Sequence, residues 1–323
     1  MFKKLHYKVR GLPTPLAGLA LGIASLGWCL ENALPLAGWG QTTGAVIGLV
    51  MIGFLVLRFT AHHDTLWADL KHPVVGSIVP TFAMCLMVVS KTAGHWMPEA
   101  GVVLWCAAVL LHLAALGIFV VTRLQEPRLE LMVPSWFVPP IGIVVADVTF
   151  PEVAVLLPFA KILFWMGAAA YAVLLPLMIY RLFFLPEVPN GAKPTIAILA
   201  APASLLLAGY LTVEKDPSLL LVALLFGIAI LMTVVIYFAF WRLLRLPFSP
   251  GYAAFTFPMA IGATALYKLS NLVAGFPGAL HYAHQIRFLA HVEVTVAAVV
   301  ILYVAALYAK NLRGMLPKLP AAA

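Results

Sequence analysis

The sequence has very little charge and no long polar segment, and these two shortages exclude most soluble proteins. Of its 323 residues only 10% are Asp, Glu, Lys or Arg, whereas 63% are hydrophobic, and the mean hydropathy is +1.03. Soluble domains carry charge on roughly a quarter of their residues. Apolar stretches of about 18 residues or more recur, and each is long enough to cross a bilayer as a helix. The composition therefore predicts an all-α polytopic membrane protein.

Cysteine is also scarce, and its three positions argue against a disulfide framework. Cys29, Cys85 and Cys106 lie in separate apolar stretches without a CxxC pair, so they are interpreted as small buried hydrophobes. His281 and His284 approach the spacing of metal ligands, but no cysteine or carboxylate completes a set. No phosphate-binding loop, nucleophile–base pair or cofactor motif is found. We therefore expect no enzyme, no cofactor and no metal site.

The apolar stretches predict ten spans joined by short connections, so that residues 1–323 form a single transmembrane domain. We expect the spans at residues 13–31, 40–61, 73–91, 100–122, 135–150, 153–183, 194–212, 218–242, 251–273 and 281–309. The fifth span is short and contains two adjacent prolines. The basic segment Met1–Arg10 leads into a full span, so a cleavable signal peptide is not expected.

Positive charge is distributed asymmetrically between the two sides of this predicted domain. Most of the 20 Lys and Arg residues fall on one side, among them Lys3, Arg10, Arg58, Arg123, Arg181, Arg242 and Lys310. Lys91 and Lys215 lie on the other side. Because short cytoplasmic loops are enriched in Lys and Arg, we expect both termini in the cytoplasm. This asymmetry accounts for the net charge of +8 without a nucleic-acid partner.

Proline recurs inside alternate spans at a nearly constant spacing. The positions are Pro15, Pro80, Pro139 with Pro140, Pro202 and Pro258, which are separated by about 56 to 65 residues. That spacing equals one helical hairpin, so the chain is interpreted as five pseudo-symmetric copies of a two-helix unit. Proline bends or breaks a helix. We expect five kinked helices in an inner ring around a central pore, and five straighter helices in an outer ring that faces lipid.

The ninth span contains FTFPMA at residues 255–260, and its polar residues select one of the two phenylalanines. At about 100° per residue, Phe257 shares a helix face with Thr264 and Lys268 to within roughly 20°, whereas Phe255 points to nearly the opposite side. If this face lines a pore, Phe257 projects into it and Lys268 lies nearer the outer mouth. Lys268 then either attracts anions or extends to the membrane interface.

Small residues mark one face of the first span. Thr14, Gly18, Gly22 and Ser25 recur there at helical spacing. This face either lines the pore or packs closely against a neighbouring helix, and the sequence leaves both interpretations open.

Three charged residues fall in or near the sixth and tenth spans, which are predicted to be outer helices. Lys161, Arg287 and Glu293 are expected to pair with one another or to reach the interface rather than to bind substrate, because an unpaired charge inside a bilayer is costly.

Taken in order, these motifs resemble the tellurite-resistance/dicarboxylate transporter family, which includes bacterial tellurite-resistance homologues and the slow-type anion channels of plants. The likeness covers about residues 11–310 and follows LPTPLAGLALGIASLGW, HPVVGSIVPTFAM, PSWFVPP, LAAPA and FTFPM. The resemblance implies ten helices in five hairpins, one pore per protomer and a homotrimer. It also implies that the second aromatic of FTFPM, here Phe257, is the pore gate, and that Lys268 matches a lysine of the plant branch.

The expected function is a gated channel for small monovalent anions such as chloride or nitrate, in a bacterial inner membrane. The alternative is a secondary carrier that exports an oxyanion or a C4-dicarboxylate, such as tellurite, sulfite or malate, coupled to protons. A carrier needs ionisable residues near the membrane midplane. The central parts of the inner spans have no carboxylate, since Asp147 lies toward an outer end. The sequence therefore favours the channel, with inorganic anions and lipid as its partners.

Overall fold

The computed structural model describes residues 2–317, and every regular element in that range is a helix. Residue 1 and residues 318–323, at the two ends of the predicted domain, lie outside the described residues. Eight of the described segments are long and apolar enough to cross a membrane. The prediction of an all-helical, multi-pass membrane protein is confirmed.

The eight segments coincide with eight of the ten predicted spans. They are Leu16–Ala33, Trp39–Ala61, Val75–Trp96, Pro98–Leu124, Ala154–Phe184, Lys193–Val213, Leu219–Leu243 and Leu280–Met315. The fifth predicted span corresponds to Pro134–Val148, which is apolar but short, and the ninth to a 3₁₀ turn and helix at residues 250–274. A total of ten spans therefore stays a prediction.

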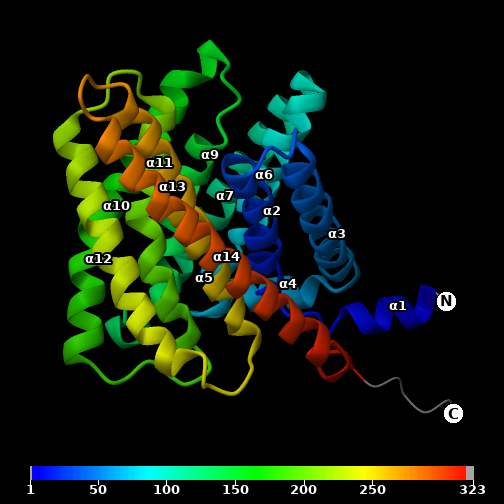
Figure 1. The fold of residues 1–323 in the computed structure, drawn as a ribbon. Coiled ribbons are helices and arrows are strands. Elements are labelled where there is room, and N and C mark those ends of the chain that lie inside the picture. Colours follow the sequence, from blue (N-terminus) through cyan, green and yellow to red (C-terminus); the bar gives the residue numbers. More distant parts are fainter. Residues whose placement is uncertain (1, 318–323) are drawn as a thin grey trace, which may run out of the picture.

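Five long helices expose much of their apolar surface. They are α3 (Trp39–Ala61), α7 (Pro98–Leu124), α10 (Leu157–Phe184), α12 (Leu219–Leu243) and α14 (Leu280–Met315). Only 28–39% of their most apolar windows is buried, and Phe183, Leu220 and Phe238 are among the exposed side chains. Exposed apolar surface of this extent suits contact with lipid. Figure 1 shows α12 and α3 on opposite sides of the bundle.

Five shorter or broken segments form the interior. The first is α2 (Leu16–Ala33), and the second is α5 (Val75–Ile78) with α6 (Thr81–Trp96). The third is a succession of short helices, where η denotes a 3₁₀ helix: η2 (Pro134–Phe137), α8 (Val138–Ile141), η3 (Gly142–Val144) and α9 (Val145–Val148). The fourth is η5 (Lys193–Ala200) with α11 (Ala201–Val213), and the fifth is η6 (Pro250–Phe255) with α13 (Thr256–Ala274). In the three of these segments that are long and apolar enough to span, 61–83% of the window is buried. The smaller described elements are α1 (Phe2–Val9), α4 (His63–Lys71), η1 (Leu129–Leu131) and η4 (Ala154–Leu156).

Proline marks the point where four of the five inner segments become a regular α-helix; in the third, Pro139 and Pro140 lie in the four-residue helix α8. Pro15 and Pro80 directly precede α2 and α6, while Pro202 and Pro258 lie in the first turns of α11 and α13. These positions tolerate proline because a residue in the first helical turn needs no N–H donor. The later inner segments thus begin as a short or 3₁₀ turn and continue as an α-helix near the proline.

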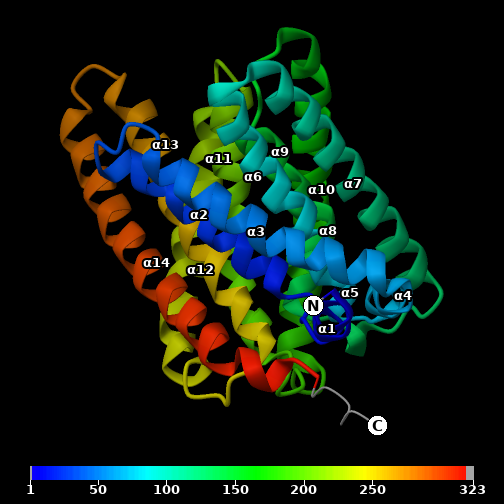
Figure 2. The ribbon, with the colours of Figure 1, turned by 90° about the vertical axis from the view of Figure 1, so that its right-hand side faces the viewer.

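The inner segments contact one another in cyclic order. Helix α2 contacts α6 and α13, α11 contacts α9 and α13, and α6 contacts α9. Each inner segment also packs against the outer helix that follows it in the chain: α2 on α3, α6 on α7, α9 on α10, α11 on α12 and α13 on α14. Figure 2 shows α14 and α7 on opposite sides, with α2 and α3 crossing between them. The helical hairpin is therefore the packing unit.

Candidate functional site

A cavity of about 60 Å³ lies among residues of the five inner segments. Its wall is made by Pro15, Gly18, Leu21, Ile78, Thr81, Met84, Phe137, Val138, Ile141, Gly142, Ile198, Ala201, Pro202, Leu205, Gly251, Ala253, Ala254, Phe257 and Pro258. Among these described residues only Thr81 has a polar side chain, and its hydroxyl donates to the carbonyl oxygen of Ile78. The space is large enough for a few water molecules, but its wall has almost no polar partner for them.

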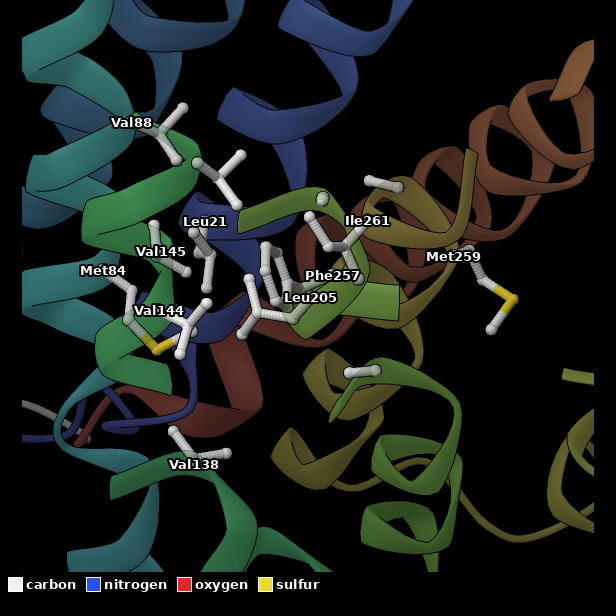
Figure 3. Close-up of a cluster of buried hydrophobic side chains, with 14 of the residues drawn as sticks. Leu21, Met84, Val88, Val138, Val144, Val145, Leu205, Phe257, Met259 and Ile261 are labelled. Carbon is white, nitrogen blue, oxygen red and sulfur yellow. The ribbon is translucent and has the colours of Figure 1, made fainter. Parts of the chain in front are cut away.

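Phe257 lies in an apolar cluster to which every inner segment contributes. Figure 3 shows its ring beside Leu205 of α11 and close to Leu21 of α2, with Met84 of α6 and Val145 of α9 on the other side of the cluster. All of them except Val145 border the cavity. Phe257 is 9% exposed and Val145 is buried. The ring of Phe257 therefore lies at a small apolar cavity, whose wall also contains the ring of Phe137.

Phe255 has a different environment although it is only two residues away from Phe257. It is 0% exposed, and its ring centroid lies 4.7 Å from that of Tyr252 and 5.4 Å from that of Phe240 on the outer helix α12. It is not part of the cavity wall among the described residues. The two phenylalanines thus face different neighbours, and the gating role of Phe257 stays a prediction.

The other residues predicted to line a pore divide into two groups. Pro15, Gly18, Pro202 and Pro258 are part of the cavity wall, whereas Gly22, Pro80, Pro139, Pro140 and Thr264 are not among its described lining residues. Gly22 lies against Thr256 of α13, where an added Cβ would collide with the threonine side chain. Pro139 accepts a hydrogen bond of 2.8 Å from Nε2 of His112. The Thr264 hydroxyl donates to a carbonyl one turn earlier in α13. Gly22 thus contacts another inner segment and Pro139 an outer helix, whereas the Thr264 hydrogen bond stays within α13.

Lys268 lies on α13, eleven residues after Phe257, and near the ion pair of Lys91 with Glu152. Lys91 Nζ donates to Glu152 Oε1 at 3.0 Å and to the carbonyl oxygen of Phe150 at 3.1 Å. The Lys91 ammonium, and to a smaller extent that of Lys268, holds the pKa of the Glu152 carboxyl below its ordinary value. No carboxylate lies within ion-pair distance of Lys268 in residues 2–317.

Glu293 contacts an inner segment, which the sequence did not indicate. It is only 6% exposed, it accepts a hydrogen bond from the hydroxyl of Tyr237, and its Oε1 lies 3.0 Å from where a Cβ on Gly262 would be. This carboxyl on an outer helix therefore points inward against α13. Lys161 pairs instead with Glu214, at 2.9 Å. The sequence signal for Glu293 was a carboxyl inside an apolar span, because such a group usually faces the interior of the helix bundle.

Arg287 completes the set of three charges for which pairing with one another or a place at the interface was expected. Its guanidinium donates to Asn271 Oδ1 at 3.0 Å and is exposed. In the described part of the chain, Lys161, Arg287 and Glu293 do not pair with one another. Each finds its partner on a neighbouring helix or, for Lys161, directly after the end of one.

Asp147 is a second buried carboxyl. It lies on α9, is 0% exposed, and neither of its side-chain oxygens has a hydrogen-bond partner among the described residues. Its Cβ is 3.3 Å from where a Cβ on Gly209 of α11 would be. A carboxylate without a partner in such a place carries a large desolvation cost, which makes Asp147 an unusual component of this apolar segment.

A buried ion pair lies next to the opening residues of α2. Arg58 donates to Asp69 Oδ2 at 2.9 Å and to the hydroxyl of Thr14 at 2.7 Å, and that hydroxyl donates to Asp69. The network joins α2, α3 and α4 beside Pro15, which borders the cavity. The sequence indicated only that Arg58 flanks a loop; a partner 11 residues away on another helix has no sequence signal.

Comparison with known proteins supplies the family. Residues 15–309 match the SLAC1 family, described as voltage-dependent anion channel. The chain is 26% identical over 232 residues to an uncharacterized transporter of Methanocaldococcus jannaschii, covering 63% of this chain and 66% of that relative. It is also 25% identical over 285 residues to the tellurite resistance protein TehA homolog of Haemophilus influenzae, covering 82% of this chain and 84% of that protein. The match extends from the start of α2 nearly to the end of α14, so the chain belongs to the voltage-dependent anion channel family.

Proposed function

We propose that this protein is a gated channel that conducts small monovalent anions, such as chloride or nitrate, passively across a membrane. The observation that carries the proposal is the apolar cavity among the five inner segments, with Phe257 in its wall. Membership of an anion-channel family supports the same class of substrate.

In this proposal the five inner segments form a ring around a central pore, and the five long helices form a second ring in contact with lipid. The cyclic contacts of α2, α6, α9, α11 and α13 support the inner ring. The contrast between 61–83% burial of inner spans and 28–39% burial of outer spans supports the two layers. Counting the short fifth segment and the α13 segment as spans yields ten helices in five hairpins.

The proposed gate works by dewetting. An anion loses part of its hydration shell to pass a narrow apolar constriction, and a hydrophobic plug makes that step unfavourable. Phe257, Leu21 and Leu205 would form the plug, because they border one cavity from three different inner segments. Movement of a single ring would then connect the cavity to the space beyond it.

Selectivity for anions in this scheme does not need a tight binding site. Among its described lining residues the cavity has no acidic side chain, so an anion meets no opposing charge there. Lys268 adds positive charge at the far end of the same helix. A weakly attractive path allows an ion to enter and also to leave.

A proton-coupled carrier is the second candidate, and the two buried carboxyls favour it. Glu293 contacts α13 and Asp147 is buried between α9 and α11, so ionisable groups are present inside the helix bundle. A carrier would use such a group to bind the coupled proton. The substrate would be an oxyanion or a C4-dicarboxylate, for which the name of the tellurite resistance relative is the support.

We also propose a bacterial inner membrane as the location, with both termini cytoplasmic, and a homotrimer as the assembly. The location follows from the Haemophilus relative and the orientation from the distribution of Lys and Arg. The trimer follows from the family resemblance. Mass measurement of the purified protein in lipid nanodiscs tests the trimer, and cysteine labelling of added terminal residues in intact cells tests the orientation.

Recording from purified protein in planar bilayers separates channel from carrier. For a channel, the reversal potential in a chloride gradient follows the chloride equilibrium potential and does not move when a pH gradient is added. For a carrier, transport is driven by the pH gradient and single-channel steps are absent. Proton-driven flux without such steps would refute the channel proposal.

A further inference from the structure

The end of the molecule beyond the constriction contains a second, larger cavity. Its volume is about 330 Å³, and polar groups of Gln41, Lys91, His95, Thr149 and Glu152 line it together with small and apolar residues. It lies between α6, α7 and the segment that follows α9. A space of this size accommodates a small anion together with some of its water.

Lys91 connects this cavity to the face of α6 that borders the constriction. It follows Val88 by three residues and Met84 by seven, so the three residues share one helix face. Met84 borders the inner cavity, and Met84 and Val88 both belong to the apolar cluster in Figure 3. On α13, Lys268 follows Phe257 by eleven residues and shares its face. Two lysines therefore continue two pore-facing stripes at the same end of the molecule.

Glu152 pairs with Lys91 at 3.0 Å, while Lys268 lies near it but is not among the described residues of the cavity wall. Its carboxylate accepts a hydrogen bond from Lys91, and both Lys91 and Lys268 are close enough to favour its charged form. Its backbone φ is +61°, a left-handed conformation that is uncommon for a residue other than glycine. Such residues cluster at functional sites, where surrounding contacts hold them.

We propose that Lys91, Lys268 and Glu152 form a binding site for one monovalent anion at the mouth of the pore, in which Glu152 competes with the anion for Lys91. Two ammonium groups and one carboxylate leave one positive charge. A chloride or nitrate ion entering the cavity neutralises that charge, and Glu152 limits how tightly the ion is held. The inference rests on the proposed anion channel and adds a site that concentrates the ion before the constriction.

The charged and titratable groups around Glu152 are few. Helix α6 contributes Lys91 and His95, and α13 contributes Lys268; α3 and α7 contribute Gln41, Pro98, Gly101 and Val102 to the cavity wall, none of which is charged. Substitutions at positions 91 and 152 therefore change the charge of the mouth in a controlled way.

The test measures single-channel conductance of the full-length protein in bilayers as a function of chloride concentration. Glu152→Gln raises the charge of the mouth and should lower the half-saturating chloride concentration about fivefold, with a smaller effect at 1 M salt because salt screens charge. Lys91→Gln should raise it by a similar factor. The double variant restores the original net charge and should return close to the wild-type value.

A matched control exists at the opposite end of the molecule. Lys193 and Glu187 form an ion pair of the same length, 3.0 Å, with side chains 28% and 88% exposed, against 28% and 79% for Lys91 and Glu152. Helix α10, with 28 residues and a length of about 42 Å, separates the two pairs. Glu187→Gln should leave the half-saturating concentration unchanged.

The outcomes separate the two proposals. Wild-type protein without anion current would overturn the proposed function itself. Normal wild-type current with half-saturating concentrations that are unchanged in Glu152→Gln and Lys91→Gln would overturn the mouth site alone. A double variant that is impaired as much as Lys91→Gln would also overturn it, because net charge would then not set the affinity.

Discussion

Replacing Phe257 with alanine gives the most direct test of the proposed gate. The ring borders the apolar cavity of about 60 Å³ together with Leu21 and Leu205. Its removal would join this cavity to the space beyond the cluster, and water would enter. A barrier lowered by about 1.4 kcal/mol raises the conduction rate tenfold, and we expect an increase of at least that size.

The loss of unfolding free energy in the same variant is a second quantity that can be predicted. Space that opens to water is not left empty, so Phe257→Ala should lose mainly the burial of the ring, which is about 1.5–3 kcal/mol. Phe255→Ala is the matched control. Phe255 is enclosed by Tyr252 and Phe240, so its removal leaves a dry cavity and should cost about 3–5 kcal/mol.

The assay combines bilayer recording with thermal unfolding of the purified protein in detergent. Phe257→Ala should show high current and a modest loss of stability, whereas Phe255→Ala should show no added current and a larger loss. A folded Phe257→Ala protein with wild-type current would refute the gate. Equal gains of current in both variants would show that loosened packing, rather than removal of a plug, opens the path.

Three further predictions concern charged residues. Asp69→Asn removes the partner of the buried Arg58 and should cost about 3–5 kcal/mol of unfolding free energy, whereas Asp64→Asn at an exposed pair should cost less than about 1 kcal/mol; chemical denaturation compares them. Glu293→Gln should leave chloride currents and the reversal potential unchanged in a channel, and should abolish proton-driven flux in a carrier. Lysine lowers the pKa of Glu152 from 4.5, so its ion pair is intact above pH 4.5 and is lost as the pH falls through the lowered pKa. Protonation of Glu152 should therefore raise the current as the pH falls below 4.5, and Glu152→Gln should remove that part of the rise.

The sequence predicts the helical class and the alternation of the segments well, because both depend on local composition. Apolar length requires helices in lipid, and the periodic prolines indicate which segments are irregular. The structure places Pro15, Pro80, Pro202 and Pro258 at or near the starts of regular α-helices. Pro80 and Pro202 also lie inside the longer apolar helical segments Val75–Trp96 and Lys193–Val213. Both placements of proline were compatible with the sequence, because proline is tolerated in the first turn of a helix and bends a helix when it lies further inside.

The candidate site could be predicted only in part. Helix geometry separates Phe257 from Phe255 because 100° per residue applies to any regular stretch, and the two residues do have different neighbours. The same angles place Thr264 with Phe257, yet Thr264 is not among the described residues of the cavity wall. An angle around one helix does not specify which neighbouring helix faces it at each height.

The sequence by itself determined that this chain is a set of apolar helices, because hydrophobic length acts within single segments, and the proline spacing predicts a five-fold repeat. Only the tertiary structure decided which side chains meet. The pairs of Lys91 with Glu152, Arg58 with Asp69 and Glu293 with Tyr237 all join different segments. Their formation depends on how helices are rotated and offset against one another, and packing across the whole bundle sets those quantities.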